Sequence, residues 1–337
     1  MGSLNFGKGA FADHLHEIIG YKAGMAASIE QMCDLLNESG YADEIRSSEQ
    51  YGLRIRSEEY ESLYYNLLHK IGVTDKPYEG IFEIFRLNRE LTKVNGEKFS
   101  QDIFNIFHAE IEKETKLAIK EGRKSLNPRG MLTQASRKYG KVGLDSMMKV
   151  IEEHERFRNF NPHGGSRWNE WNDVVDLNDL FSSFKSTVTN GDFFDQRFID
   201  FLSVNQEKLG KIHWRKFEEL IGECFVKFGY EVQLGPGSND DGVDLRAWNG
   251  TASKSPEYII QCKRQESKID KVTVKGLYAD VMEEGAEMGL LVTTSEFSPG
   301  ARKTVDVRGY PIGEVNGEMI KNWLVELRTP GAGIVRV

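Results

Sequence analysis

The sequence predicts an α+β protein, with a helical N-terminal domain and a C-terminal α/β domain whose central mixed sheet is flanked by helices. Two observations lead to this class. Residues 10–160 carry apolar side chains mainly at helical spacing. From residue 196 onward, helical segments alternate with short strand-like runs. We therefore expect a helical domain at residues 1–160, a connector at 161–195 and the α/β domain at 196–337.

The composition is that of an ordinary globular protein, with 337 residues, 39% hydrophobic and 28% charged. The net charge of −8 argues against a protein that coats nucleic acid by bulk charge, although it is compatible with a local basic groove. Three cysteines without zinc-type spacing fit a reducing compartment, so we expect a cytoplasmic protein. No signal peptide pattern and no apolar run of ~20 residues is present, so we expect no membrane partner.

The N-terminal region contains several amphipathic segments that end at glycines. Residues 10–40 form the first, and Gly40, Gly72 and Gly96 are the expected stop signals. A long fourth segment covers residues 99–122. Apolar stripes on such helices must be covered by one another, which predicts a helical domain for recognition, oligomerisation or regulation.

Basic residues are concentrated near the end of this region. From Lys113 to Lys149 there are ten Lys or Arg and three Asp or Glu, so the segment carries 10 − 3 = +7. Residues 130–153 read as two short helices around a glycine turn. The segment is either a solvated helix face or a surface that contacts phosphates, and the sequence supports both readings equally.

The connector at residues 161–195 differs from both flanking regions. Pro162, Gly164 and many Asn, Asp and Ser residues interrupt regular structure. We expect Trp168 and Trp171 to fix this segment to one of the domains. A platform for a peptide or a nucleobase is the alternative role for the two rings.

The helix expected at residues 217–228 presents a single apolar stripe. Its members recur at i, i+3, i+4, i+7, i+8 and i+11, from Phe217 to Phe228. At about 100° per residue, Glu218 lies at the edge of this stripe, whereas Glu219 and Glu223 fall on the opposite side. Glu218 is therefore the glutamate expected to face the sheet.

Polar side chains also occur in two expected strands. Asp244 lies at a strand start between Val243 and Leu245, after a glycine-rich turn. In the strand at residues 258–263, side chains alternate, so Gln261 and Lys263 point to one face. Buried polar groups of this kind need a partner.

A hairpin can bring Asp244 beside Gln261 and Lys263. The Asp244 carboxylate, the Gln261 amide oxygen and the Cys262 backbone carbonyl are hard oxygen donors of the kind that Mg²⁺ prefers, with Mn²⁺ as a substitute. An adjacent lysine can position a hydrolytic water and balance charge that develops on a phosphate. The residues thus indicate a metal-assisted phosphodiester hydrolysis site.

These segments resemble the Mrr-type restriction endonucleases of the PD-(D/E)XK nuclease superfamily. The matching text, in order, is FEELIGECFVKFGYEV, DDGVDL, YIIQCKR and GLLVTTSEFSPGA, and LSVNQEKLGKIHWRKFEEL is similar to the lead-in of that family. The similarity covers roughly residues 196–325. It implies a restriction-endonuclease-like fold for the C-terminal domain and says nothing of residues 1–160.

The resemblance also implies roles. Asp244 is the metal-binding carboxylate, Lys263 the catalytic lysine and Glu218 a supporting acid. Gln261 takes the place that the wider superfamily fills with Glu or Asp, which lowers the negative charge of the site and leaves open one or two metals. Asp241 replaces a glycine of the usual turn.

The expected activity is that of a Mg²⁺-dependent endonuclease on double-stranded DNA, foreign or modified, in prokaryotic defence. Cleavage of both strands favours a dimer or larger homo-oligomer, and a regulatory partner protein fits the additional domain. A repair or junction-resolving nuclease and a non-catalytic DNA-binding module are the alternatives. Basic residues near the site in sequence are expected to line a DNA groove: Lys211, Arg215, Lys216, Arg264, Lys268 and Lys271.

Overall fold

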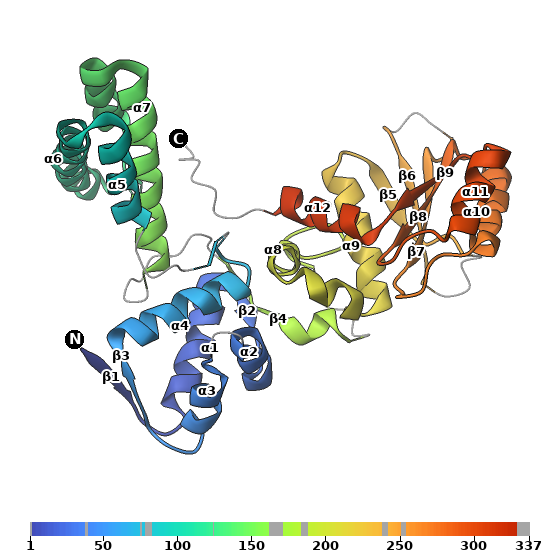
Figure 1. Ribbon diagram of the computed structural model, residues 1–337, viewed down its shortest axis with the longest axis horizontal. Helices are drawn as coiled ribbons and strands as arrows, with labels where there is room; N and C mark the ends of the chain where they lie inside the picture. Colours follow the sequence, from blue (N-terminus) through green and yellow to red (C-terminus); the bar gives the residue numbers. More distant parts are fainter. Residues whose placement is uncertain are drawn as a thin grey trace.

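The computed structural model describes residues 2–37, 40–74, 76–77, 83–123, 125–161, 171–182, 188–237, 242–250 and 254–328. The predicted α+β class is confirmed. Figure 1 shows a helical N-terminal region followed by a sheet covered by helices on both faces. No helix in the described residues has both the length and the apolar character needed to cross a membrane.

The first helical body contains four helices and short strands. Its elements are β1 (Ser3–Phe6), α1 (Ala10–Ala23), β2 (Met25–Ala26), α2 (Ile29–Leu36), α3 (Ala42–Ser48), β3 (Leu53–Arg56) and α4 (Ser57–Lys70). Strands β1 and β3 pair antiparallel, which the helical reading of this region missed. The segment at residues 10–40 is broken because Gly24 adopts φ 63 and Ser28 caps a new helix.

Three helices form a second body with a core of its own. They are α5 (Glu83–Asn95), α6 (Glu97–Glu121) and α7 (Arg129–Phe160). Their buried core includes Leu91, Phe107 and Met147. Within α7 the backbone leaves helical geometry at Gly140 (φ 60, ψ −144), so the predicted pair of helices around a glycine turn is correct.

The C-terminal region holds one five-stranded mixed sheet. Its order is β5 (Glu231–Leu234), β6 (Leu245–Trp248), β7 (Tyr258–Lys263), β8 (Met288–Thr293) and β9 (Ile312–Val315). Strands β5, β6 and β7 are antiparallel neighbours, and β7, β8 and β9 are parallel.

Helices cover both faces of this sheet. The connector contains β4 (Val175–Asp176) and η2 (Leu177–Leu180), and between it and the sheet lie α8 (Gln196–Val204), η3 (Gln206–Lys211) and α9 (Trp214–Lys227). The remaining helices are α10 (Lys271–Glu284), α11 (Pro299–Arg308) and α12 (Gly317–Leu327). Buried residues of α9 and α12 share a core with one face, and those of α10 and α11 share a core with the other.

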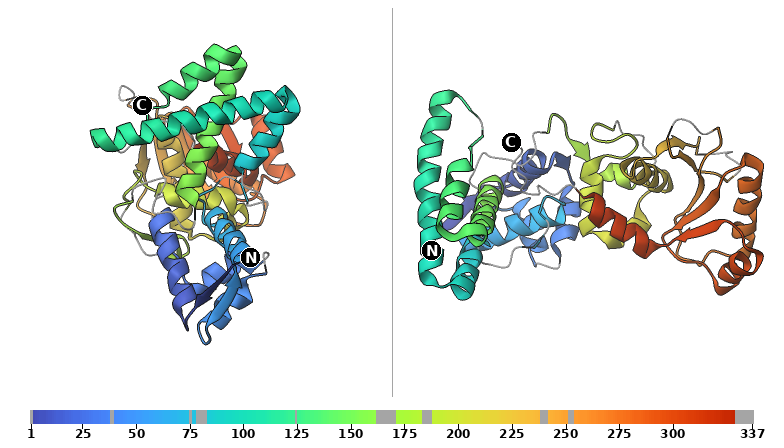
Figure 2. Two further views of the ribbon diagram at one scale, coloured as in Figure 1. Left: turned by 90° about the vertical axis from the view of Figure 1, so that its left-hand side faces the viewer. Right: turned by 90° about the horizontal axis from the view of Figure 1, so that it is seen from above.

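A continuous core joins the first helical body to the C-terminal region. It runs from Phe11 through Leu177 to Leu324, and β2 pairs in parallel with β4 of the connector. The domain boundaries proposed from the sequence stay a prediction, because this packing groups residues from both sides of the connector. The helices α5, α6 and α7 lie at the opposite end of the molecule from the sheet (Figure 2).

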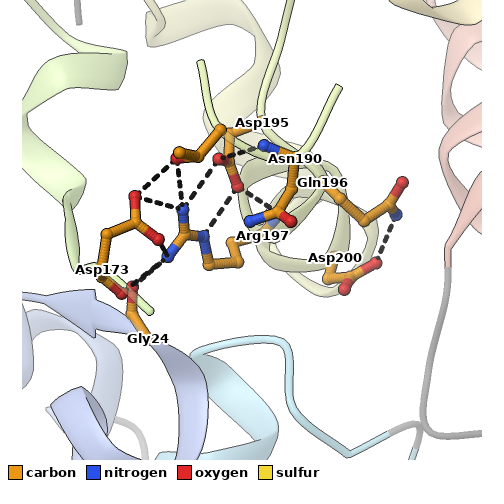
Figure 3. Close-up of polar contacts among 8 residues, drawn as sticks. Gly24, Asp173, Asn190, Asp195, Gln196, Arg197 and Asp200 are labelled. Carbon is orange, nitrogen blue, oxygen red and sulfur yellow. Dashed lines mark hydrogen bonds and ion pairs between the residues drawn. The ribbon is translucent and has the colours of Figure 1, made fainter. Parts of the chain in front are cut away.

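A buried arginine fixes the connector at the junction. The guanidinium of Arg197, 1% exposed, donates to Asp195, Asp173 and the backbone carbonyl of Gly24 over 2.8–3.3 Å (Figure 3). It also lies 4.8 Å from the centre of the Trp171 ring. Trp171 therefore fixes the connector as expected, while Trp168 lies outside the described residues.

Candidate active site

The candidate site lies where strands β6 and β7 diverge. Leu245 pairs with Ile260, and one residue earlier the N–H of Asp244 donates to the Ile260 carbonyl at 2.9 Å. There the ladder ends, and Asp244 Oδ2 accepts a hydrogen bond from the N–H of Cys262 at 2.6 Å. The carboxylate thus replaces a backbone acceptor that the diverging strand no longer provides. Asp244 stands immediately before β6 and not within it.

Strand β7 presents its side chains as the sequence predicted. Ile260 and Cys262 pack into the core that contains α9. Gln261 pairs with Leu291, which belongs to the core on the opposite face. By strand alternation, Lys263 points to the same side as Gln261. The N–H and C=O of one strand residue point to the same neighbour, so the Cys262 carbonyl is directed toward Asp244.

Glu218 reaches this site from α9. Its side chain is 8% exposed, and burial raises the pKa of its carboxyl to about 8. The negative charge of Asp244 acts in the same direction, and a hydrogen bond between the two carboxyl groups favours the protonated form. The Arg215 guanidinium opposes this shift only in part. Glu218 and Asp244 therefore meet inside the protein, with a proton held between them at neutral pH.

The amide oxygen of Gln261 is the unsatisfied group of the cluster. Gln261 is 9% exposed, and its Oε1 is buried without a hydrogen-bond partner. Buried polar atoms are nearly always paired, so an exception calls for an explanation such as an ion or a water molecule. Within the described residues, Lys263 Nζ likewise has no hydrogen bond or ion pair. An acceptor and a cationic donor thus occupy the two β7 positions that flank Cys262, whose N–H donates to Asp244.

The backbone of Lys263 is held by a residue to which the sequence assigned no role. The hydroxyl of Thr293 donates to the Lys263 carbonyl at 2.8 Å, and Thr293 is fully buried. The same hydroxyl accepts from the N–H of Ser295 at 3.1 Å. A Val-Thr-Thr run at the end of a strand was visible in the sequence, but the contact depends on the parallel pairing of β7 with β8.

Arg215 connects the acidic site to the segment that precedes Asp244. Its guanidinium donates to Glu218 Oε2 at 2.8 Å and to the Gly235 carbonyl at 2.9 Å. The N–H of Gly235 in turn donates to the Asp244 carbonyl at 2.7 Å. This chain of bonds connects α9 to the segment that carries Asp244. Arg215 thus has internal partners on both sides, and its contact with DNA stays a prediction.

Lys216, which the sequence predicted to line a DNA groove, lies inside the protein. It is 3% exposed, and its Nζ lies 2.7 Å from Glu219 Oε2, so the ammonium forms a buried ion pair. Glu219 and Glu223, which the sequence places on the side of α9 opposite the apolar stripe, are also buried. Glu223 accepts backbone N–H groups of residues 192–194, which cover the second side of α9.

The other basic residues expected to line a groove fall into two groups, those with a polar partner inside the protein and those without an ion pair. Arg264 donates to the Gly210 carbonyl at 2.7 Å, and Lys268 lies 2.6 Å from Glu296. Lys211 and Lys271 are exposed and carry no ion pair in the described residues. Asp241 lies outside the described residues.

The donor set of the cluster is mixed. Where the structure is described, no group of three or more His, Cys, Asp and Glu side chains could hold a metal ion. The cluster instead combines two carboxyl groups with the unpaired amide oxygen of Gln261 and the Cys262 carbonyl. Oxygen donors that share a proton can bind a hard divalent cation, because the cation can take the place of the proton. The residues present therefore fit Mg²⁺ or Mn²⁺.

Comparisons with known proteins identify a nuclease family for the part of the chain that carries these residues. Residues 209–324 match the family model Mrr_cat, described as restriction endonuclease. The uncharacterized protein y4cE of Sinorhizobium fredii is 29% identical over 102 residues, which cover 30% of this chain and 26% of that protein. This chain therefore spans about a quarter of the length of that relative.

A solved structure is also similar in part. It is the MspJI restriction endonuclease in complex with a 27-mer oligonucleotide, with 20% identity over 48% of this chain and 37% of that chain. The TM-score is 0.27, a value too low to establish a shared architecture. The family match and the order of the four motifs carry the assignment: the C-terminal region of this chain is an Mrr-type restriction endonuclease domain.

Proposed function

We propose that the protein is a divalent-metal-dependent endonuclease that hydrolyses phosphodiester bonds of double-stranded DNA. One observation carries the proposal. The Asp244 carboxyl accepts a hydrogen bond from the N–H of Cys262, and the two β7 residues that flank Cys262 carry the unpaired amide oxygen of Gln261 and the unpaired ammonium of Lys263, in an Mrr-type domain. Such a set serves no evident purpose in stabilising the fold, since it leaves a buried acceptor unpaired.

Each residue has a role in this scheme. Asp244, Gln261 and the Cys262 carbonyl would hold Mg²⁺ or Mn²⁺, which when bound polarises the phosphate and lowers the pKa of a coordinated water. Lys263 donates hydrogen bonds to the attacking water and to the phosphate oxygens, whose negative charge increases in the transition state. Glu218 holds the proton that it shares with Asp244 and releases it when a cation is bound.

The family match also supports a proposal for the biological setting. A restriction-type nuclease domain joined to additional helical bodies suits recognition of foreign or modified DNA in prokaryotic defence, and a homo-oligomer would supply one active site to each strand. A regulatory partner that acts on the helical bodies fits the same arrangement.

Cleavage of supercoiled plasmid tests the proposal. Methylated and unmethylated plasmid would be incubated with Mg²⁺, with Mn²⁺ or with EDTA. We expect metal-dependent nicking or linearisation that Asp244→Ala and Lys263→Ala both abolish. The exposed residues Asp306 and Lys303 of α11 provide matched controls, Asp306→Ala and Lys303→Ala, that should cleave like the wild type. Cleavage that survives both site variants, or folded protein that cleaves no plasmid, would overturn the proposal.

A further inference from the structure

The basic segment at residues 113–149 belongs to helices α6 and α7, at the opposite end of the molecule from the sheet (Figures 1 and 2). Since the segment carries +7 and the whole chain −8, the rest of the chain carries −8 − 7 = −15. The charge of the protein is therefore strongly divided between these helices and the remaining chain. A polyanion that approaches the protein would be attracted to this surface.

The nine cations of this segment that lie in the described residues are of two kinds; the tenth, Lys124, is outside them. Four of them make ion pairs with nearby carboxylates: Lys113 with Glu110, Lys116 with Glu112, Arg123 with Glu114 and Glu121, and Lys138 with Asp102. Five others are exposed and have no ion pair in the described part of the chain: Lys120, Arg129, Arg137, Lys141 and Lys149. The acidic residues of α6 thus neutralise the first group and leave the second available.

Three of the unpaired cations lie on the outer face of α7, by which we mean the sides of its two segments, before and after the turn at Gly140, that point away from the core. In the second half of the helix, Met147, Val150 and Ile151 are buried against the core, so Lys141 and Lys149 point away from it. In the first half, Met131 and Ala135 are buried, which places Arg137 on the outer side. Asp145 is the one acidic residue between positions 129 and 149.

We propose that this outer face of α7, with Arg137, Lys141 and Lys149, binds the phosphate backbone of duplex DNA outside the cleavage site. The inference rests on the proposed function, because DNA is the polyanion on which the C-terminal domain is proposed to act. Unpaired Lys and Arg side chains on a helix face contact phosphates and release condensed counterions. The exposed apolar residues Val142 and Met148 on the same segment make a protein partner the competing occupant.

The test compares two triple variants that remove the same charge. The first, Arg137→Gln/Lys141→Gln/Lys149→Gln, removes the unpaired cations. The second, Lys113→Gln/Lys116→Gln/Lys138→Gln, removes cations that already have carboxylate partners. Binding of a fluorescent duplex to the full chain would be measured by anisotropy in EDTA, between about 50 and 200 mM KCl.

We expect the first variant to reduce the slope of log K against log salt by about 2 to 3, since each phosphate contact contributes about 0.9. The paired-cation variant should change the slope much less. Equal effects of the two variants would mean a bulk-charge effect, and no effect of either would mean that the face does not bind DNA; both results overturn the inference. Unchanged DNA binding combined with loss of self-association in light scattering would assign the face to protein contact and also overturn it.

The DNA-binding result for α7 can be distinguished from the plasmid-cleavage result that tests the proposed nuclease. The binding assay contains no metal and measures no cleavage, so a reduced salt slope would support the inference even if plasmid cleavage failed. Conversely, cleavage that depends on Asp244 together with unchanged salt slopes would support the nuclease and reject this surface. Circular dichroism melts of both triple variants would confirm that each is folded.

Discussion

Two buried clusters of charge in this protein are built in opposite ways. Around Arg197, the guanidinium donates to two carboxylates, two backbone carbonyls and a hydroxyl. Around Asp244, a second carboxyl group lies against the first, and a buried amide oxygen has no partner. The first cluster is electrostatically complete, whereas the second leaves a carboxyl pair sharing a proton and one amide oxygen without a hydrogen bond.

The difference separates a structural role from a functional one. A complete network stabilises the junction between Gly24, the connector and α8, and nothing can be added to it. An incomplete cluster costs stability and persists where binding of an ion or substrate offsets the cost. The following predictions, from the largest expected effect to the smallest, test whether this contrast holds.

Removing the cation of the complete cluster should cost the most stability. Arg197→Met leaves Asp195 and Asp173 without their partner, and breaking such a buried pair costs about 3–5 kcal/mol. Denaturant unfolding would measure the free energy. The surface pair of Arg46 with Asp43 is the control, because both side chains are more than half exposed and Arg46→Met should cost less than about 1 kcal/mol. Similar losses of unfolding free energy for Arg197→Met and Arg46→Met would contradict the contrast between the two clusters.

Removing the cation beside the incomplete cluster should affect catalysis and not folding. Lys263→Ala takes away an ammonium that has no ion pair in the described residues, so unfolding free energy should change little. The cleavage rate should fall by about 100-fold or more, the usual effect of losing a donor to a developing oxyanion. Single-turnover cleavage and denaturant unfolding on the same preparation would show both. A large loss of stability would assign Lys263 a structural role.

The proton held by Glu218 makes stability depend on pH. With a folded pKa of about 8 and an ordinary unfolded value of 4.5, the folded state binds the extra proton between these values. Stability is thus fully present below the unfolded value and is lost as pH rises toward the folded value, by at most about 1.4 kcal/mol per pH unit. Glu218→Gln should remove this contribution.

Urea unfolding in EDTA, at about pH 5 and about pH 8, would measure the difference between Glu218→Gln and the wild type. We expect the variant to gain stability relative to the wild type as pH rises. The comparison within one pH cancels the opposite trends of Asp102 and Glu114, whose pKa values are lowered by hydrogen bonds to Lys138 and to the Asn127 backbone. An identical pH slope in both proteins would show that Glu218 is ionised in the fold.

A positioning role of Arg215 within the site predicts a smaller effect. Arg215→Lys can reach Glu218 or the Gly235 carbonyl but not both, so the cleavage rate should fall by about 10-fold. Arg215→Met also removes a charge that lowers the Glu218 pKa, so the pH profile of cleavage should move to higher pH. The salt slope of DNA binding should stay unchanged. A reduced slope with an unmoved pH profile would assign Arg215 to the DNA-contacting residues.

Much of the incomplete cluster could be predicted from the sequence because it depends on local rules. Strand alternation places Gln261 and Lys263 together, and a hairpin places Asp244 opposite them. The burial of α9 could be predicted only for one side of the helix. The apolar stripe shows only the side that meets the sheet, whereas Glu219 and Glu223 are buried by other segments.

The complete cluster was invisible in the sequence for a different reason. Arg197 bonds to Gly24, which lies 173 positions away, and to Asp173 across the connector. No periodicity encodes such a contact. The break at Gly24 was missed as well, because the apolar spacing continues across it. It depends on a left-handed backbone at a position where a Cβ atom would collide with the Trp171 ring.

Mn²⁺ binding, measured by calorimetry in the absence of DNA, tests the central contrast most directly. The account predicts saturable binding to the wild-type chain at neutral pH, absent in folded Asp244→Ala and retained in the control Asp306→Ala. Saturable binding that persists in Asp244→Ala, or its absence from the folded wild type, would contradict the account, because the cluster would then not be the cation site.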